Sequence, residues 1–469
     1  MSFLDDLQND FIRQFRTIPS ITTSIFDLVS YLEASQYELI QLMVNNGIWQ
    51  GTVPPDPGGD GAMELGLVPY WIKNPPPEIQ GYIDSNPILK GVWTLLTFLV
   101  PDKFSTENYN ALKTAAGTNG VVADDGTIFG ESAYEQMDHR WMWAYLNYLI
   151  VKYVDDRASF HTLPPDKVTP VQLTGATAGQ VKIAIVGDWG TGTFTDGTSQ
   201  DVMNQILAME PKPDYIIHLG DVYYAGTADL FFPLNEEQDN FLAAWPTAEQ
   251  QTPGTSFTLN SNHEMYSGAK GYYLAIADPR FAQQKDLSYF ALQYGGWTLL
   301  GLDSAFFTTS HFYMQGSIGG NSGIQATWIK QLGISADKSI VMTHHTGLSA
   351  SGASENSVLC NEVKSALGDD PAAWYWGHIH NAIVYKSPTK TGRNTLSRCI
   401  GHGAIPFGDG WGIPGPYVDY YAHTPDPNLP GSHRVLNGFA TLTITDSGSI
   451  TEEFFEQGNE TAVYSNTYE

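Results

Sequence analysis

The spacing of hydrophobic positions changes near residue 160 of the 469-residue chain. Before that point, apolar residues recur at helical intervals in two long runs, which loops rich in Pro and Gly separate. The first run begins at Ser24, which with Asp27 has the spacing of a capping box, and continues to Met43. The second covers residues 137–153. The pattern predicts a mainly helical N-terminal region over residues 1–160, with a packing or covering role.

A polar segment with three prolines, residues 161–180, predicts a linker. Beyond it, short apolar runs at 181–186 and 214–219 flank a helical pattern that begins near Ser199. Strand, helix and strand in this order predict a βαβ unit and a partly parallel sheet. The remaining pattern predicts a terminal hairpin over 439–457 and strands at 256–259, 287–294, 297–302, 339–342 and 372–376. Together these elements predict an α/β domain over residues 181–469.

The charge balance limits the partners of this protein. Its formal net charge is −27, from 50 acidic and 23 basic residues. Such a surface repels nucleic acid and anionic lipid, so neither is an expected partner. It also repels phosphorylated ligands, so a phosphate site would need local positive charge. Because Lys and Arg are few, bound metal cations are its natural source.

The N-terminal residues, the most apolar stretch and the two cysteines bear on location and on disulfide bonding. The first residues are acidic and lack the basic start and apolar run of a secretory signal. The most apolar stretch, 91–100, is too short to span a bilayer. We therefore expect a soluble protein and favour a cytoplasmic location. Cys360 and Cys399 could form one disulfide, which the sequence leaves open.

Five short segments each follow a predicted strand and carry residue types that bind metals. Strand ends in open α/β sheets face one crevice, so ligands spread over about 190 residues can meet there. The mixed oxygen and nitrogen set suits iron, zinc or manganese better than calcium. The set also contains more ligands than one ion needs, and it suits two ions that share a bridging carboxylate. The candidate ligands are Asp188, Asp221, Tyr224, Asn262, His344, His378 and His380.

In order and spacing, these segments resemble the signature of the calcineurin-like metallophosphoesterases, over about residues 181–457. Within that superfamily they are most similar to the purple acid phosphatases. Most superfamily members carry a His where this chain has Gly190. Purple acid phosphatases also have Gly there, and compensate with a Tyr three residues after the bridging Asp, where this chain has Tyr224. The resemblance implies a four-layer α/β/β/α sandwich with an N-terminal helical extension.

The resemblance also implies a metal centre and an activity. One ion would be Fe(III), because a phenolate is a hard ligand, and the other divalent iron, zinc or manganese. The implied reaction is hydrolysis of phosphate monoesters by a metal-bound hydroxide, with a small phosphate ester as partner. Asp221 would bridge the two ions. The first would take Asp188, Asp221, Tyr224 and His380, and the second Asp221, Asn262, His344 and His378.

Residues near the ligands have less certain roles in the reaction. Ser261 replaces the usual Gly before Asn262, and we expect only a small backbone effect. His263 is expected to bond the phosphate or protonate the leaving group. His345 either lines the pocket or points away, and His402, on a Gly-flanked turn, is a further pocket candidate. Two residues are expected to be structural, His218 in a strand and Asp303 at a strand end.

Two other functions remain open at this stage. A phosphodiesterase, for example one acting on cyclic nucleotides, would use the same metals, because substrate choice depends on pocket walls that motifs do not define. A non-catalytic metallophosphoesterase-like binding module would be expected to have lost ligands, whereas all seven are present.

Overall fold

The computed structural model describes residues 20–58, 63–100, 104–192, 198–228, 234–410 and 412–469. The chain divides into two compact units. Unit 1 comprises Met1–Val121, Phe129–Ser132 and Gln136–Asp156, and unit 2 comprises Val122–Ile128, Ala133–Glu135 and Arg157–Glu469. Two short pieces of the N-terminal region therefore fold with unit 2.

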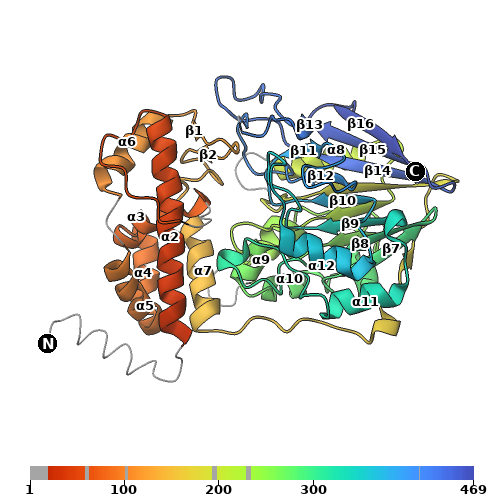
Figure 1. Ribbon diagram of the computed structural model, residues 1–469, viewed down its shortest axis with the longest axis horizontal. Coiled ribbons are helices and arrows are strands. Elements are labelled where there is room, and N and C mark those ends of the chain that lie inside the picture. Colours follow the sequence, from red (N-terminus) through yellow and green to blue (C-terminus); the bar gives the residue numbers. More distant parts are fainter. Residues whose placement is uncertain (1–19, 59–62, 101–103, 193–197, 229–233, 411) are drawn as a thin grey trace. The chain divides into compact units, whose positions relative to one another are not determined.

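Unit 1 is mainly helical, as predicted (Figure 1). The short strands β1 (Val121–Val122) and β2 (Ile128–Phe129) pair where the two units alternate along the chain. Asn86 caps α5, since its side chain accepts hydrogen bonds from the backbone of Ile88 and Leu89. The helices are α2 (Ser20–Asn45), α3 (Val68–Lys73), α4 (Pro77–Ser85), α5 (Pro87–Leu99), α6 (Thr106–Ala116) and α7 (Trp141–Tyr153), with the turn η1 (Met63–Leu65).

The predicted start of the first helix is wrong. Ser24 lies inside α2, which is already helical at Ser20, so Ser24 cannot be its N-cap. The second predicted helix, α7, exists but begins at Trp141, four residues later than the apolar pattern suggests. Before it, the Asp138 carboxylate accepts a hydrogen bond from the backbone N–H of Arg140 and forms a turn.

Within its described residues, unit 2 contains an eight-stranded and a six-stranded sheet (Figure 1). The first has the order β13-β11-β12-β10-β9-β8-β7-β3, and the second β16-β15-β14-β4-β5-β6. The strands of the first are β3 (Val171–Gln172), β7 (Phe290–Tyr294), β8 (Trp297–Gly301), β9 (Ser339–Thr343), β10 (Ala373–Trp376), β11 (Ala382–Tyr385), β12 (Leu396–Ile400) and β13 (Val418–Tyr421). Those of the second are β4 (Gln180–Val186), β5 (Tyr215–His218), β6 (Ser256–Thr258), β14 (Gly438–Thr445), β15 (Ile450–Glu456) and β16 (Tyr464–Tyr468).

The two sheets pack face to face and carry helices on their outer faces. Along β4, Ile183 and Ile185 point into the core between the sheets, while Ala184 and Val186 pack outward. The outer face of the six-stranded sheet is covered by α8 (Thr198–Ala208) and the π-helical turn η3 (Glu237–Leu242). The outer face of the other sheet is covered by α11 (Ile324–Leu332) and α12 (Ser357–Leu367). This arrangement confirms the predicted α/β/β/α fold class.

Short helices complete unit 2 between its strands. They are η2 (Pro165–Lys167), α9 (Asn262–Tyr266), α10 (Lys270–Ala275), η4 (Pro279–Gln284), η5 (His311–Tyr313) and η6 (Ala336–Lys338). The predicted βαβ unit is present as β4, α8 and β5, with the two strands parallel. The terminal hairpin is present as β14 and β15. The proposed linker contains β3, which pairs with Leu292 and Gln293 of β7, so part of it belongs to a sheet.

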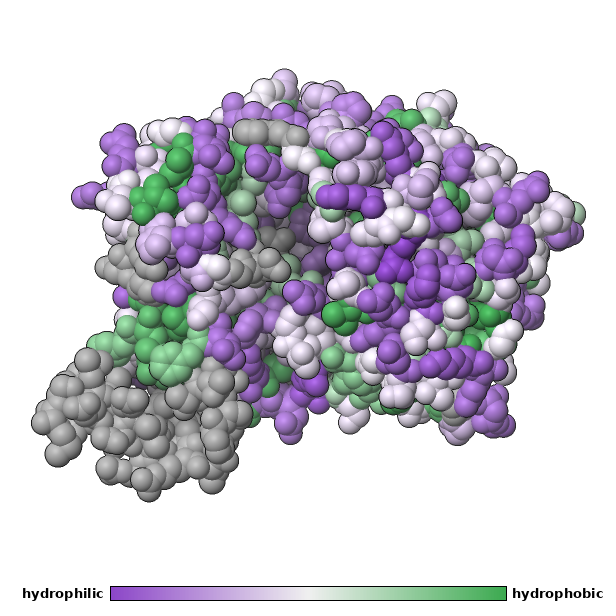
Figure 2. All heavy atoms as spheres, in the orientation of Figure 1, coloured by the Kyte–Doolittle hydropathy of each residue, from purple (hydrophilic) through white to green (hydrophobic). Residues whose placement is uncertain are grey.

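The surface and the cysteines add three facts. On the face shown in Figure 2, hydrophilic residues predominate. Among the helices that the structure describes, none is long and apolar enough to cross a lipid bilayer. Cys360 and Cys399 are free and buried, in α12 and β12 respectively, so they form no disulfide.

Candidate metal centre

The loops that follow five strands carry the predicted ligands. β4, β5 and β6 run parallel in one sheet, and β9 and β10 run parallel in the other. Parallel strands end at the same edge of a sheet, so the loops after them can meet. Six predicted ligands are buried or nearly so after these strands, with Asn262 as the first residue of α9 and the others in loops: Asp188, Asp221, Asn262, His344, His378 and His380.

One group of donor atoms surrounds Nε2 of His344. This nitrogen lies 2.8 Å from Oδ1 of Asn262, 3.1 Å from Nδ1 of His378 and 3.2 Å from Oδ1 of Asp221. The other ring nitrogen, Nδ1, lies 3.1 Å from the carbonyl oxygen of Leu219, which can only accept. Nδ1 therefore carries the hydrogen and Nε2 presents a lone pair. Burial lowers the pKa of His344 well below its usual value, which keeps the ring neutral.

A second group of atoms surrounds the hydroxyl of Tyr223. This hydroxyl donates to Oδ2 of Asp221 at 2.8 Å and lies 3.1 Å from Nε2 of His380. It also lies 3.4 Å from Oδ1 of Asp188, which is 3.5 Å from Nε2 of His380. The backbone N–H of His378 donates to both oxygens of Asp188, at 3.1 and 2.8 Å, and fixes that carboxylate.

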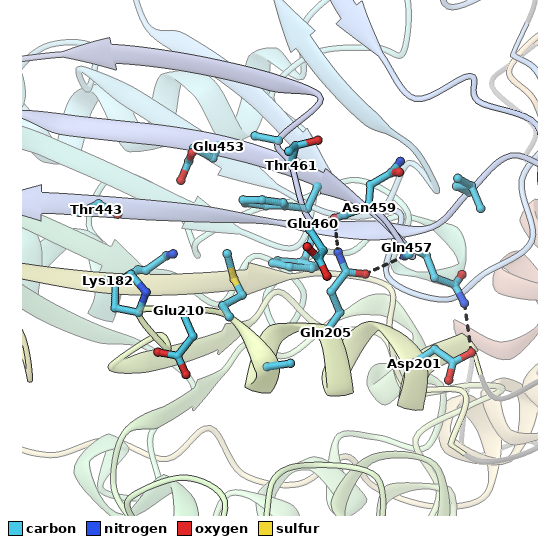
Figure 3. A pocket seen from close by; sticks show the side chains of 18 of the residues that line it. Lys182, Asp201, Gln205, Glu210, Thr443, Glu453, Gln457, Asn459, Glu460 and Thr461 are labelled. Atoms are coloured by element: carbon cyan, nitrogen blue, oxygen red, sulfur yellow. Dashed lines mark hydrogen bonds between the residues drawn. The ribbon is translucent and has the colours of Figure 1, made fainter.

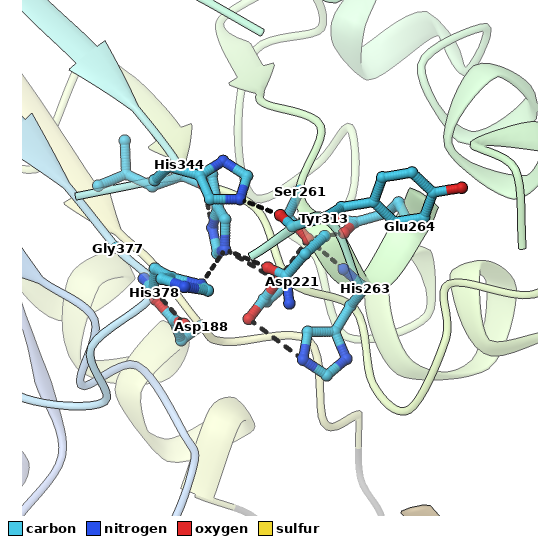
Figure 4. Close-up of polar contacts among 12 residues, drawn as sticks. Asp188, Asp221, Ser261, His263, Glu264, Tyr313, His344, Gly377 and His378 are labelled. Atoms are coloured by element: carbon cyan, nitrogen blue, oxygen red, sulfur yellow. Dashed lines mark hydrogen bonds and ion pairs between the residues drawn. The ribbon is translucent and has the colours of Figure 1, made fainter. Parts of the chain in front are cut away.

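Asp221 belongs to both groups, with Oδ1 in the first and Oδ2 in the second. Figure 4 shows Asp221 between His344 and His263. Among the described residues, ligand atoms of Asp188, Asp221 and His344 lie within 4.8 Å of one another, close enough to hold a metal ion. Burial and the nearby Asp221 raise the pKa of Asp188 well above its usual value. Burial acts the same way on Asp221, but His263, His344 and Ser261 outweigh it and lower its pKa. Two buried carboxylates this close favour a cation between them.

The backbone at these ligands is unusual. Asp188, Asp221 and His378 have φ values of 55°, 77° and 68°, in the left-handed region that non-glycine residues rarely adopt. Each such residue costs on the order of 1–3 kcal/mol, and such residues cluster at functional sites. All three come within three residues of a strand end, where the chain turns sharply.

Gly190 is the position where the resemblance described above would place a histidine ligand in most superfamily members. It pairs with Val222 in an isolated bridge. A Cβ atom at this position would lie 2.7 Å from the carbonyl oxygen of Asp221 and from Cα of Val222. Real Cβ atoms essentially never come that close to backbone atoms. The structure therefore excludes a side chain at this place unless the backbone moves.

The two adjacent tyrosines lie differently from expectation. The hydroxyl among the ligand atoms is that of Tyr223, which was not on our list of candidates. The ring of Tyr224, the predicted ligand, stacks on that of Tyr134, with centroids 4.8 Å apart and planes at 24°. Tyr134 comes from the N-terminal region and donates a hydrogen bond to the carbonyl of Thr191 at 3.2 Å. No motif around Tyr134 could have revealed it.

The three candidate catalytic histidines have different surroundings. His263 lies beside the ligands, with Nε2 3.8 Å from Oδ2 of Asp221 (Figure 4). Both ring nitrogens of His345 contact protein groups: Nδ1 lies 2.9 Å from the hydroxyl of Ser304 and Nε2 2.6 Å from the carbonyl of Tyr313. His402 is buried and bonds the backbone of Phe455, and its Nδ1 has no partner among the described residues.

Ser261 does more than the small backbone effect that we expected. Its hydroxyl contacts Oδ1 of Asp221 and Oε2 of Glu264, and accepts a hydrogen bond from the backbone of His263 at 3.0 Å. It therefore caps α9 and touches the carboxylate shared by both donor groups. A glycine could make none of these contacts, so that expectation is wrong.

His218 and Asp303 have structural contacts, as expected. His218 is fully buried, its Nδ1 lies 3.1 Å from the hydroxyl of Thr258, and its ring stacks on Phe241. Asp303 accepts hydrogen bonds from the backbone of Ala305 and Phe306, both at 2.9 Å.

A separate groove of about 1270 Å³ lies between α8 and the β14–β15 hairpin (Figure 3). Gln205 crosses part of it: its amide donates to the carbonyl of Asn459 at 2.7 Å and accepts from the backbone of Gly458 at 2.8 Å. None of the predicted ligands lines this groove, so it is not the metal centre.

Comparison with protein families gave one match within unit 2. Residues 181–382 match the calcineurin-like phosphoesterase family. Residues 181–382 are therefore similar to the domain of a family of phosphoric ester hydrolases that use a dinuclear metal centre. Comparison with curated proteins gave no match.

Three solved structures have some similarity to this chain. Purple acid phosphatase PPD1 from yellow lupin (Lupinus luteus) seeds is 17% identical, with a TM-score of 0.44 over 62% of this chain and 54% of that one. GAP50, the anchor in the inner membrane complex of Plasmodium, is 14% identical, with a TM-score of 0.43 over 61% and 88%. PhoD is 10% identical, with a TM-score of 0.40 over 63% and 69%. The chain thus spans about half the length of the lupin phosphatase.

Proposed function

Because residues 181–382 match the calcineurin-like phosphoesterase family, we propose that the chain hydrolyses phosphate monoesters at a dinuclear centre, as an acid phosphatase of the purple type. One observation carries the proposal. The two oxygens of Asp221 face two separate groups of donor atoms, 3.2 Å from His344 on one side and 2.8 Å from a tyrosine hydroxyl on the other. A shared carboxylate of this kind suits a pair of metal ions.

The chemistry of the two donor groups fits two ions. Around His344, a lone pair of a neutral imidazole faces the amide oxygen of Asn262 and a carboxylate oxygen, and none of these three atoms carries a hydrogen. A cation turns this repulsive arrangement into an attractive one. A mixed oxygen and imidazole set suits iron, zinc or manganese. When bound, the ions would hold the phosphate by charge and lower the pKa of a water molecule that acts as nucleophile.

We assign the two sites by their donors. The harder, more anionic set, with Asp188, Asp221, a tyrosine and His380, suits Fe(III). The set with Asn262, His344 and His378 beside Asp221 suits a divalent ion.

His263 is the best placed group to act on the leaving oxygen. Its Nδ1 lies 2.7 Å from the carbonyl of Tyr224, which can only accept, so Nδ1 carries a hydrogen. Its Nε2 lies 3.8 Å from Oδ2 of Asp221, on the side of the donor groups, and in the doubly protonated imidazolium it would give its hydrogen to a departing alkoxide. His345 and His402 would act by positioning, because the contacts given above bind them to the protein frame.

The test uses the purified full chain, first with its metals and then after chelation. We expect two metal ions per chain by elemental analysis and hydrolysis of p-nitrophenyl phosphate that disappears on chelation and returns with metal. Bis(p-nitrophenyl) phosphate tests the diesterase alternative in the same assay. Faster cleavage of the diester would overturn the monoester assignment, and undiminished activity of the stripped protein would overturn the metal mechanism.

A further inference from the structure

Two tyrosines stand side by side after the bridging carboxylate, and only their surroundings tell them apart. We propose that Tyr223, rather than Tyr224, supplies the phenol ligand of the metal centre. The inference rests on the proposed dinuclear function and concerns one ligand of its Asp188 and His380 side. It departs from the position that the family resemblance implies.

The hydroxyl of Tyr223 lies among the other donors of that side. It is 2.8 Å from Asp221 Oδ2, 3.1 Å from His380 Nε2 and 3.4 Å from Asp188 Oδ1. A phenol has one hydrogen and can donate to one of these acceptors at a time. A metal ion among them would take the place of that hydrogen and satisfy all three.

The ring of Tyr223 is also held in this direction. It is fully buried and packs against the ring of His263, with centroids 4.5 Å apart. Its backbone carbonyl accepts a hydrogen bond from the Asn240 side chain at 2.6 Å. The hydroxyl is therefore positioned by packing and by a backbone bond, which is the preorganisation that a metal ligand needs.

The contacts of Tyr224 direct it elsewhere. Its backbone N–H donates to Glu236 at 2.6 Å, and its carbonyl lies 2.7 Å from Nδ1 of His263. These contacts fix the backbone of the residue, while its ring stacks on Tyr134. The hydroxyl of Tyr223 therefore lies among the ligand atoms, while the ring of Tyr224 packs on Tyr134.

Tyr134 is itself fastened within unit 2. Its hydroxyl donates to the carbonyl of Thr191, and the next residue, Glu135, pairs with Arg434 at 2.8 Å. Both residues of the Tyr134–Tyr224 stack are therefore held by hydrogen bonds within unit 2.

The absence of room at Gly190 agrees with this assignment. A His at that place would supply a ligand next to Asp188, and the backbone of Asp221 and Val222 excludes it. The hydroxyl of Tyr223 lies 3.4 Å from Asp188 and can supply the missing donor.

The test compares Tyr223→Phe with Tyr224→Phe in the full-length protein. Each variant removes one hydroxyl and keeps its ring, so they are matched controls for each other. The stripped proteins are reloaded with Fe(III) and Zn(II), metal content is measured, and visible absorption and resonance Raman spectra are recorded without substrate. We expect a phenolate-to-iron absorption band in the wild type and in Tyr224→Phe, and its loss in Tyr223→Phe.

Loss of the band in Tyr224→Phe with retention in Tyr223→Phe overturns the inference, and so does an iron-loaded wild type without a band. If Tyr223→Phe does not fold, Tyr224→Phe decides alone: a wild-type band supports the inference and a lost band overturns it. Hydrolysis of p-nitrophenyl phosphate is measured separately on the same samples. Hydrolysis with the band assigned to Tyr224 contradicts only the inference, whereas a band assigned to Tyr223 without hydrolysis contradicts only the proposed function.

Discussion

Unit 2 contains two kinds of buried histidine that differ in what their ring nitrogens face. The strand-end histidines are His344, His378 and His380, and the packed histidines are His218, His345 and His402. Burial lowers the pKa in both groups, for example to about 4 in His378 and also in His402. A lowered pKa therefore does not distinguish a candidate metal ligand from a core residue.

The ring partners do distinguish them. His345 has a serine hydroxyl and a backbone carbonyl as partners, and His218 has the hydroxyl of Thr258. In contrast, Nε2 of His344 faces an amide oxygen and a carboxylate oxygen, neither of which donates. Among the described residues, Nε2 of His218 and Nδ1 of His402 face no polar partner, and both nitrogens of His345 have one. His344 differs from all three because its Nε2 faces acceptors, an arrangement that a cation would make attractive. Three predictions test this difference, beginning with the largest effect.

Asp221→Ala removes the carboxylate that both donor groups share. We expect loss of bound metal and a fall in activity of more than about 100-fold, the upper end for changes beside a metal. Asp303→Ala is the matched control, since it removes a buried carboxylate that bonds only nearby backbone and side-chain groups. Elemental analysis of both proteins should show metal loss in the first and near-normal metal in the second. Equal metal content in the two variants would contradict the bridging role.

His344 and His345 are neighbours in sequence but belong to different groups. His344→Gln should lose one of the two metal ions and most activity. His345→Gln should keep both ions and lose about 1–3 kcal/mol of stability, because it disturbs buried hydrogen bonds. Metal content and urea unfolding measure the two effects. A His345→Gln protein that lacks metal and unfolds normally would place His345 among the ligands.

The packed histidines should make the protein acid-sensitive. Burial lowers the pKa of His218 from 6.5 to about 3, so between these values the unfolded chain binds a proton that the folded chain does not. Stability is therefore lost as the pH falls below 6.5, by about 1.4 kcal/mol per pH unit for each such residue. His218→Phe should reduce the loss of stability per pH unit between pH 6 and 4. Urea unfolding of the metal-free protein at several pH values measures this loss. An unchanged slope would show that His218 titrates normally.

The order of the candidate ligands and their meeting at the strand ends follow from sequence, because parallel strands end at one edge. The direction of a side chain within a loop does not. The spacing favoured Tyr224, three residues after Asp221, and only the contacts of the folded loop place the hydroxyl of Tyr223 among the ligand atoms. Whether the assembled residues bind metal stays a prediction.

Other features depend on contacts that no local pattern encodes. Tyr134 lies 87 positions before Asp221, in a region whose apolar pattern predicts helices. The bonds of Ser261 to Asp221 and Glu264 arise from the fold of α9. β11 and β13 have four residues each, too few for a recognisable alternation.

The crowding at Gly190 also bears on how such sites change during evolution. A single Gly190→His substitution would restore the common superfamily motif in sequence, yet the new side chain would collide with the backbone of the neighbouring loop. The intermediate on the path from one ligand arrangement to the other would therefore be a damaged protein. With the phenol ligand proposed above, exchanging a histidine-containing centre for a tyrosine-containing one would require the loops around Gly190 and Asp221 to change together.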